Sequence, residues 1–325
     1  MQIIENTTEF EIKGRSAVSI GKFDGVHRGH QELLRRIRMQ KEQGLQAVVL
    51  TFHPHPAAFF GFSNKKELMT RKEKRQIFQN LGVDILIEFP FTKETAAIPA
   101  DIFLRDILAG RLHMAYLAAG ADVSFGAEGA GDFAMLQSMQ ERYGYQVELV
   151  EKIKDGGRVI SSTAVKEELE AGNLSAVSRM TGRPFRLSGK VVYGNQLGRT
   201  IGIPTANLLP SEEKLLPPNG VYYSRVWIGE ACYPGMSNIG LKPTVSKDAA
   251  QLGLETYLYA FSEDIYGKDI SVDLLAFRRP EKKFSSLQEL QTQMEADLEA
   301  GRQFHRESDP EAKCWMKNTE TEIQK

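Results

Sequence analysis

The chain has 325 residues, of which 42% are hydrophobic and 26% charged, and its net charge of −1 excludes a general electrostatic attraction to nucleic acid or membranes. No apolar run has the length of a membrane-spanning helix, and residues 1–6 do not begin a secretory signal, so we expect a cytoplasmic protein. The length predicts two domains, each large enough to bury its own core.

The first half alternates short apolar runs with helical patterns. Strands are predicted at 17–21, 46–52, 84–89, 115–119 and 145–153, and helices at 30–43, 70–81, 99–109, 132–143 and 174–181. The helix over 70–81 starts with Thr70 as its N-cap and Glu73 as the capping-box partner. This alternation predicts an α/β domain with a parallel sheet covered on both faces, whose ligands lie beyond the carboxyl ends of the strands.

The segment after the first predicted strand has the composition of a phosphate site. It reads Gly21-Lys22-Phe23-Asp24-Gly25-Val26-His27-Arg28-Gly29-His30 and leads into a helix, whose first N–H groups attract anions. His27 and His30 could stabilise charge on a phosphoryl group, and Gly29 would let the backbone approach closely. A helix cap, or a metal pair with His53 or His55 as third ligand, explains the same residues. His53 and His55 also suit a plain loop.

Three hydroxyl residues precede the next predicted helix, which runs to about residue 171. They are Ser161, Ser162 and Thr163, and Lys166 lies one turn inside the helix. Ordinary N-capping explains one hydroxyl, whereas a triphosphate clamp would use all three. From these residues alone, capping is the simpler interpretation.

Residues 182–184, Gly-Arg-Pro, indicate a domain boundary, which predicts a first domain at 1–183 and a second at 184–306, with a polar tail at 307–325. Strands predicted at 185–193, 220–228, 252–261 and 269–277 indicate an antiparallel β-barrel. Residues 285–304 form an amphipathic helix. Its predicted core-facing residues are Leu287, Leu290, Met294 and Leu298.

A second candidate phosphate site occupies residues 194–208. Its glycines, which permit positive φ and close approach to a ligand, are Gly194, Gly198 and Gly202. Arg199 could add a forked contact to phosphate. Thr205 and Asn207 lie two apart, so on an extended segment both could offer oxygen to Mg²⁺. A turn in which both bond their own backbone is the alternative, but it leaves the arginine and the three glycines unexplained.

Several motifs now follow one another in a recognisable order. They are 21–31 with its His-x-Gly-His, Thr-Phe-His-Pro-His-Pro at 51–56, 121–126, Ile-Ser-Ser-Thr at 160–163, Gly-Arg-x-x-Gly-x-Pro-Thr-Ala-Asn at 198–207, Asn-Ile-Gly at 238–240, Asp-Ile-Tyr-Gly at 264–267, and the helix from Phe284. Over nearly its whole length the chain resembles the bifunctional prokaryotic riboflavin kinase/FAD synthetases. The resemblance implies an N-terminal Rossmann-like nucleotidylyltransferase domain and a C-terminal antiparallel β-barrel with a terminal helix.

The resemblance also implies two reactions and their site residues. ATP and Mg²⁺ would convert riboflavin to FMN, and a second ATP would convert FMN to FAD with release of pyrophosphate. The kinase residues implied are catalytic Glu255, then Gly194, Gly198, Arg199, Gly202, Thr205 and Asn207 around ATP, with Thr205 and Asn207 on Mg²⁺. The adenylyltransferase residues implied are catalytic His27 and His30, then Gly21, Phe23, Asp24, Gly25, Gly29, Ser161, Ser162, Thr163 and Lys166 around ATP. Asp122 and Asn238 would lie on the flavin side.

Some positions depart from the family pattern. Ala164 and Lys166 stand where Arg is usual, Lys22 where Asn is common, His53 where Glu is common, and Tyr257 and Tyr259 where His and Asp are common. Lysine keeps a point charge but lacks the guanidinium fork. Two alternatives therefore stay open: a riboflavin kinase with a weak or inactive adenylyltransferase domain, and a flavin-sensing regulator, which would carry a basic stripe with exposed aromatic side chains. The expected partners are riboflavin, FMN, FAD and ATP, without nucleic acid or membrane; the sequence does not predict the oligomeric state.

Overall fold

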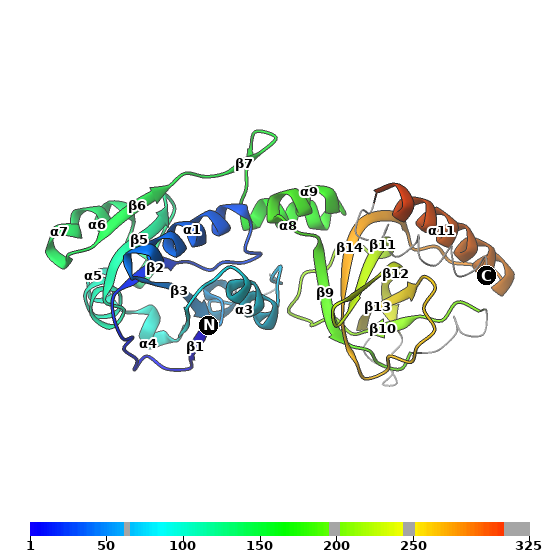
Figure 1. The fold of residues 1–325 in the computed structure, drawn as a ribbon, viewed down its shortest axis with the longest axis horizontal. Coiled ribbons are helices and arrows are strands. Elements are labelled where there is room, and N and C mark those ends of the chain that lie inside the picture. Colours follow the sequence, from blue (N-terminus) through cyan, green and yellow to red (C-terminus); the bar gives the residue numbers. More distant parts are fainter. Residues whose placement is uncertain (62–65, 195–201, 243–250, 309–325) are drawn as a thin grey trace. The chain divides into compact units, whose positions relative to one another are not determined.

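The computed structural model describes residues 1–61, 66–194, 202–242 and 251–308. The chain divides into two compact units (Figure 1). The first comprises Met1–Lys166 and the short segment Glu213–Leu215, and the second comprises Glu167–Glu212 and Leu216–Lys325. This division by contacts falls within a helix, and the domain boundary at residue 183 stays a prediction.

The first unit is built on a six-stranded parallel sheet of order β1-β4-β3-β2-β5-β6, which confirms the predicted parallel sheet. The strands are β1 (Gln2–Glu5), β2 (Ser16–Ile20), β3 (Gln46–His53), β4 (Ile85–Pro90), β5 (Met114–Gly120) and β6 (Gln146–Val150), with a small hairpin of β7 (Lys154–Asp155) and β8 (Arg158–Val159). The helices are α1 (Arg28–Met39), η1 (Gln40–Gln43), α2 (Pro56–Phe59), α3 (Arg71–Asn80), α4 (Lys93–Ala96), α5 (Ala100–Ile102), η2 (Phe103–Arg111), η3 (Ala127–Gly129), α6 (Phe133–Ser138) and α7 (Gln140–Tyr143). Helix α8 (Ser162–Glu170) spans the division between the units, and α9 (Leu174–Thr181) follows it.

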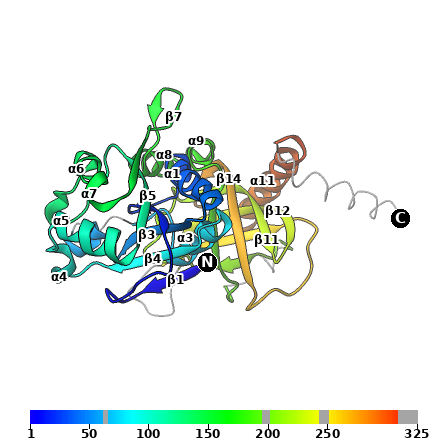
Figure 2. The same ribbon diagram turned by 60° about the vertical axis from the view of Figure 1, so that its left-hand side comes forward.

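Apolar side chains cover both faces of this sheet. Strand β2 is buried at every position. Its Val18 and Ile20 pack in the same cluster as Leu104 of η2, whereas α1 lies on the opposite face, against β2, β3 and β5 (Figure 2). Burial on both sides explains why the strands are nearly continuous apolar runs.

The start of α3 confirms the predicted capping box. The Thr70 side chain accepts a hydrogen bond from the Glu73 N–H, and the Glu73 carboxylate accepts one from the Thr70 N–H. The same carboxylate lies 2.5 Å from the ammonium of Lys214, which is 3% exposed. This ion pair, together with backbone hydrogen bonds from Glu67 to Glu213 and from Leu215 to Glu67, explains why Glu213–Leu215 belongs to the first unit.

The second unit is a six-stranded antiparallel sheet of order β10-β13-β12-β11-β14-β9. Its elements are β9 (Phe185–Lys190), β10 (Ala206–Leu208), β11 (Gly220–Ile228), β12 (Ala231–Lys242), β13 (Gln251–Leu258), β14 (Asp269–Pro280) and α11 (Leu287–Ser308). A bridge between Val192 and Asn207 joins the end of β9 to β10, so the two edges of the sheet meet as in a barrel. Strands β10 and β12 were not predicted. Strand β12 contains Pro234 and Gly235, residues that weaken a strand pattern.

Helix α11 covers the outer face of this barrel. Leu298 is buried and Met294 partly buried, as predicted, but Leu287 is 60% exposed, so its predicted place in the core was wrong. Leu287 is the first residue of the helix, whereas the buried Leu298 lies further along it. Among the described residues, no helix combines the length and the apolarity needed to cross a membrane.

Candidate active sites

The first candidate site begins at the N-terminus of α1, beyond the carboxyl end of β2. His27 is the N-cap residue, and its Nδ1 accepts a hydrogen bond from the His30 N–H at 3.4 Å. The two imidazoles stack with their centroids 3.7 Å apart, and His27 is only 7% exposed. Capping, which was one of the open alternatives, therefore also fixes the two rings side by side at the positive end of the helix dipole.

The residues before His27 form a tight turn with unusual backbone angles. Phe23 has a φ of +51° and a fully buried side chain that packs edge-on against Phe78, so it can offer only its backbone to a ligand. Gly25 has a φ of +79°, and a Cβ there would come within 2.6 Å of the Leu68 side chain. A Cβ at Gly29 would come within 3.2 Å of the His27 ring, so this glycine permits the histidine geometry.

The N-terminus of α8 adjoins this turn (Figure 2). The Ser162 hydroxyl donates a hydrogen bond to the Asp24 carbonyl at 2.8 Å. The Ser161 hydroxyl accepts one from the Ala164 N–H at 3.2 Å, which is ordinary capping, and Thr163 is exposed. The N-termini of α1 and α8, with the hydroxyls of Ser161 and Ser162, thus adjoin the turn that carries the histidine pair, a composition that suits a polyphosphate.

Asp24 connects the segments of this site. Its carboxylate, 3% exposed, accepts a hydrogen bond from the Leu68 N–H at 2.8 Å and lies 2.7 Å from the Lys166 ammonium. A carboxylate would repel a phosphate, so these contacts favour a positioning role for Asp24 over direct contact with ATP. Ala164, the other departure in this helix, is 3% exposed and belongs to the core.

Other predicted residues lie at the same edge of the sheet. His53 is the last residue of β3, His55 follows that strand, and Asp122 follows β5, so all three lie at the carboxyl ends of parallel strands. Burial lowers the pKa of His55 below its ordinary value; burial and the charge of Arg71 do the same for His53. Both imidazoles are therefore expected to be neutral at pH 7. The Asp122 carboxylate lies 3.0 Å from the Lys152 ammonium.

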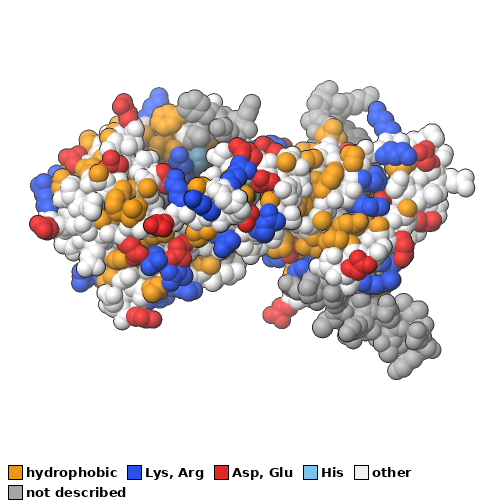
Figure 3. All heavy atoms as spheres, turned by 90° about the horizontal axis from the view of Figure 1, so that it is seen from above, with side chains coloured by type: hydrophobic (Ala, Val, Ile, Leu, Met, Phe, Trp, Pro, Cys, Tyr) orange, Lys and Arg blue, Asp and Glu red, His pale blue; other side chains and the backbone are white. Residues whose placement is uncertain are grey.

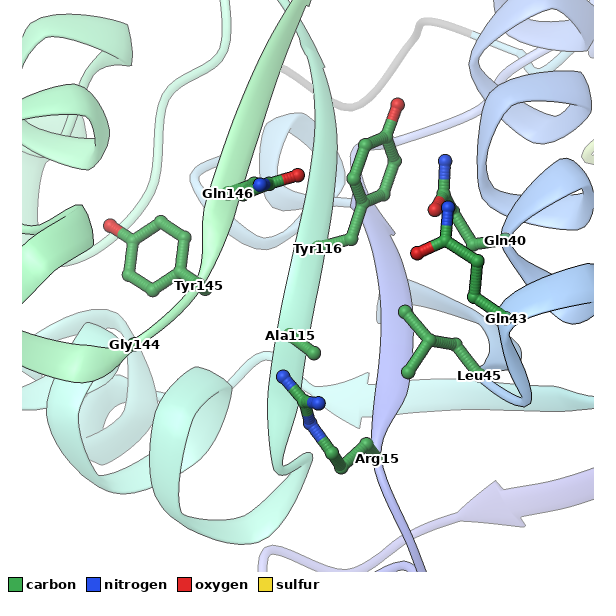
Figure 4. A pocket seen from close by; sticks show the side chains of 9 residues that line it. All are labelled: Arg15, Gln40, Gln43, Leu45, Ala115, Tyr116, Gly144, Tyr145 and Gln146. Atoms are coloured by element: carbon green, nitrogen blue, oxygen red, sulfur yellow. The ribbon is translucent and has the colours of Figure 1, made fainter.

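A cavity of about 280 Å³ opens at the opposite edge of this sheet (Figure 4). It is lined by Arg15, Gln40, Gln43, Leu45, Ala115, Tyr116, Gly144, Tyr145 and Gln146. These residues lie at or near the amino ends of strands β2, β3, β5 and β6. Ligands of such sheets bind beyond the carboxyl ends, so this cavity is not the candidate active site.

The second candidate site is a row of polar residues across three strands of the barrel. Glu255 of β13 lies directly opposite Asn207 of β10 on one side and opposite Asn238 of β12 on the other. Directly opposed residues of antiparallel strands project from the same face of the sheet. Glu255 is half-buried and lies on β13, which pairs with a strand on each side.

The start of the glycine-rich segment contacts this row. A Cβ at Gly194 would lie 2.5 Å from Oδ1 of Asn207, so the backbone of Gly194 passes directly over that amide oxygen. The Asn207 Nδ2 donates to the Thr205 carbonyl at 3.2 Å. The same Cβ would lie 2.7 Å from Cγ and 2.8 Å from Nδ2, so Gly194 packs over the whole amide group of Asn207. Gly202 has a φ of +76°, as expected for a glycine turn. Gly198 and Arg199, which complete the predicted loop, lie outside the described residues.

Tyr257 and Tyr259, two departures from the family pattern, have packing roles on this face. The buried Tyr259 hydroxyl donates to the Leu298 carbonyl of α11 at 2.8 Å, and its ring meets Tyr257 edge-on. Burial raises the pKa of Tyr259 far above its ordinary value. Tyr259 thus binds the terminal helix, and Tyr257 packs against Tyr259.

The surface bears on the regulator alternative. On the face shown in Figure 3, Lys and Arg side chains are interspersed with Asp and Glu, and among the described residues they form no continuous basic stripe. A nucleic-acid-binding regulator would gather positive charge along one face. The face shown in Figure 3 does not gather positive charge in this way.

Comparisons with known proteins show the family to which the chain belongs. A family model for FAD synthetase matches residues 9–164, and one for riboflavin kinase matches residues 181–305. The bifunctional riboflavin kinase/FMN adenylyltransferase of Escherichia coli K12 is 39% identical over 88% of this chain and 92% of its own length. The chain belongs to this family. The Haemophilus influenzae member is 37% identical, covering 89% and 94%, and the Pseudomonas fluorescens member 34% identical, covering 93% and 97%.

A solved structure resembles most of the chain. A crystal structure of a macrolide-efflux protein from Streptococcus pneumoniae is 29% identical, with a TM-score of 0.82, and covers 92% of this chain and 98% of that one. The likeness extends over both units and supports the combination of a parallel-sheet domain with an antiparallel one. The efflux activity in that protein's name has no counterpart in the two family matches.

Two contributors to these sites were not predicted from the sequence. The Leu68 N–H binds the carboxylate of Asp24, and Glu281, which follows β14, binds the side chain of Asn238. Both contacts join residues more than 40 positions apart, so no local pattern indicates which residues pair. The Arg-Pro-Glu sequence at 279–281 was the one available signal, since it places an acid directly after a strand.

Proposed function

We propose that the second domain phosphorylates riboflavin to FMN and that the first adenylylates FMN to FAD, each with its own ATP. The observation that carries this proposal is that both family matches occur in one chain, each over the candidate site of the corresponding chemistry. The matches also support the proposed domain limits of 1–183 and 184–306. The proposed small-molecule partners are riboflavin, FMN, FAD and ATP.

In the kinase, Glu255 would be the general base. The ribityl 5′-hydroxyl gives its proton to the Glu255 carboxylate while its oxygen forms a bond to the γ-phosphorus of ATP and the bond to ADP breaks. Gly194, Gly202 and the loop with Gly198 and Arg199 would enclose the phosphates. Asn238 would contact the flavin substrate from the other side of Glu255.

Mg²⁺ fits the oxygen donors beside this row. Asn207 of β10 carries an amide oxygen, and Thr205 carries a hydroxyl two residues away. Hard cations prefer such oxygen ligands. We propose that Thr205 and Asn207 hold Mg²⁺, which when bound neutralises charge on the ATP phosphates.

In the adenylyltransferase, no protein nucleophile is required, because the FMN phosphate is already an anion. Its oxygen forms a bond to the α-phosphorus of ATP, and pyrophosphate leaves. His27 and His30 would stabilise the developing charge, together with the N-termini of α1 and α8. The phosphates would be held by Gly21, Gly25, Gly29, Ser161, Ser162, Thr163 and Lys166, with the backbone of Phe23; Asp24 would hold Lys166 in place, and Asp122 would face the flavin.

One observation favours the alternative of a kinase with a weak first domain. Lys166 is paired with Asp24, and Ala164 is buried, at the two positions where the family usually carries arginine. A lysine that is already paired with a carboxylate forms weaker contacts with phosphate than the bidentate guanidinium of an arginine. We nevertheless expect adenylyl transfer, since both helix N-termini and both histidines are in place.

Labelled ATP tests the two reactions separately. With riboflavin as substrate, phosphorus from the γ position is expected in both FMN and FAD, because the kinase transfers that group and the adenylyltransferase keeps it. Phosphorus from the α position is expected in FAD and not in FMN. If α-labelled phosphorus enters no flavin while γ-labelled phosphorus enters FMN, the chain is a riboflavin kinase alone.

A further inference from the structure

The side chain of Glu281 ends the polar row of the candidate kinase site. Glu281 directly follows β14, and its Oε1 accepts a hydrogen bond from Nδ2 of Asn238 at 3.3 Å. An amide side chain has a donor nitrogen and an acceptor oxygen at opposite corners. Because its nitrogen is directed at Glu281, Asn238 presents Oδ1 in another direction. Glu281 therefore selects which atom of Asn238 faces a ligand.

Gly240 provides the space for this contact. It lies on β12 two residues after Asn238, on the same face of the strand. A Cβ at Gly240 would overlap Oε1 of Glu281, and it would lie 3.0 Å from the Glu281 Cδ and 3.2 Å from Nδ2 of Asn238. The backbone at Gly240 is not left-handed, so the conformation itself does not require glycine. Because Gly240 has no side chain, the Glu281 carboxylate can approach the strand closely.

A partly buried ion pair holds the strand end from which Glu281 projects. Arg279, two residues before Glu281, donates from Nε at 2.9 Å and from an Nη at 2.5 Å to the Asp297 carboxylate of α11. Asp297 is 3% exposed. With the end of β14 held on α11, ordering Glu281 beside Asn238 costs less conformational entropy than ordering a side chain on a free loop.

We propose that Glu281 is a positioning residue for phosphorylation of riboflavin, holding the Asn238 amide so that its Oδ1 accepts a hydrogen bond from a hydroxyl or N–H donor of the flavin substrate. The proposal rests on the kinase function proposed for the second domain. Glu281 acts through Asn238, so its removal affects the binding of riboflavin and leaves the binding of ATP unchanged.

Steady-state kinetics of FMN formation test this role. The variants E281A and G240A are expected to raise the KM for riboflavin roughly 10-fold, the effect of losing the one hydrogen bond from the substrate to Asn238, with the KM for ATP unchanged. E281Q keeps an acceptor oxygen in place and is expected to stay within about twofold of wild type. In an N238A background, E281A is expected to add nothing. The matched control is E263A, at an acidic side chain that is 68% exposed.

The outcomes separate this inference from the kinase function. A wild-type protein that phosphorylates riboflavin, with E281A keeping the wild-type KM for riboflavin, overturns the positioning role and leaves the kinase intact. An equal rise in the KM for riboflavin in E281A and E281Q also overturns it. Glutamine supplies an acceptor oxygen for Asn238, so under this role E281Q should keep the wild-type KM. A wild-type protein without riboflavin kinase activity contradicts the kinase function itself, and the inference with it.

Discussion

Glu255→Gln is expected to lower the kcat of FMN formation by a factor on the order of 10²–10⁴, the usual contribution of a general base. Glutamine keeps the size of the side chain and its place between Asn207 and Asn238, but it cannot take the proton of the ribityl hydroxyl. Since the change removes an interaction made in the transition state, kcat falls with little change in the KM for riboflavin. Separate assays with riboflavin and with FMN as substrate measure both steps.

The first domain supplies an internal comparison for this variant. Conversion of added FMN to FAD by Glu255→Gln is expected at the wild-type rate, because Glu255 belongs to the second unit and the histidine pair to the first. Glu263→Gln, at an exposed glutamate of the same unit, is expected to leave both steps unchanged. A Glu255→Gln protein that forms FMN normally would remove Glu255 from the mechanism.

His30→Ala is expected to slow the conversion of FMN to FAD by roughly 10²–10³, the effect of removing one donor that stabilises transition-state charge. His30 is a cleaner target than His27. His27 also caps α1, and losing a cap costs about 1 kcal/mol of stability, which would mix a folding effect with a catalytic one. Phosphorylation of riboflavin by the same variant is expected to be unchanged.

The control for His30→Ala lies on the same helix. Arg35→Ala removes a side chain of α1 that is 44% exposed and paired with Glu32, so both activities should remain. Thermal unfolding of the two variants shows whether α1 stays intact. Loss of both flavin products from a folded His30→Ala protein would contradict the assignment of His27 and His30 to the adenylyl transfer.

The parts of the fold that sequence predicted are those that local physics determines. The capping box of Thr70 and Glu73 depends on a spacing of three residues, and the buried strands of the first unit are recognisable in the sequence as apolar runs. Strand β12 escaped prediction because its pairing with β11 and β13 compensates for the proline and glycines within it. The helix predicted over 99–109 was found as α5 followed by the π-helix η2, a change of hydrogen-bond pattern that apolar spacing does not indicate.

The candidate sites show the same division. The glycine turns and hydroxyl residues were visible as motifs, and Glu255 was identified through resemblance to the family, since nothing local distinguishes it from the other acidic residues. Its placement between Asn207 and Asn238 depends on the register of three strands. Asp24 was predicted near phosphate, but its buried contacts with Leu68 and Lys166 arise from tertiary packing and favour a positioning role.

Separation of the flavins formed from riboflavin and Mg-ATP over time tests the central claim most directly. If one chain catalyses both reactions, FMN appears first and then declines as FAD accumulates. Added FMN is then also converted to FAD without riboflavin. FMN that accumulates while no FAD forms would contradict the bifunctional account and leave a kinase. The absence of both products would contradict the enzymatic account as a whole.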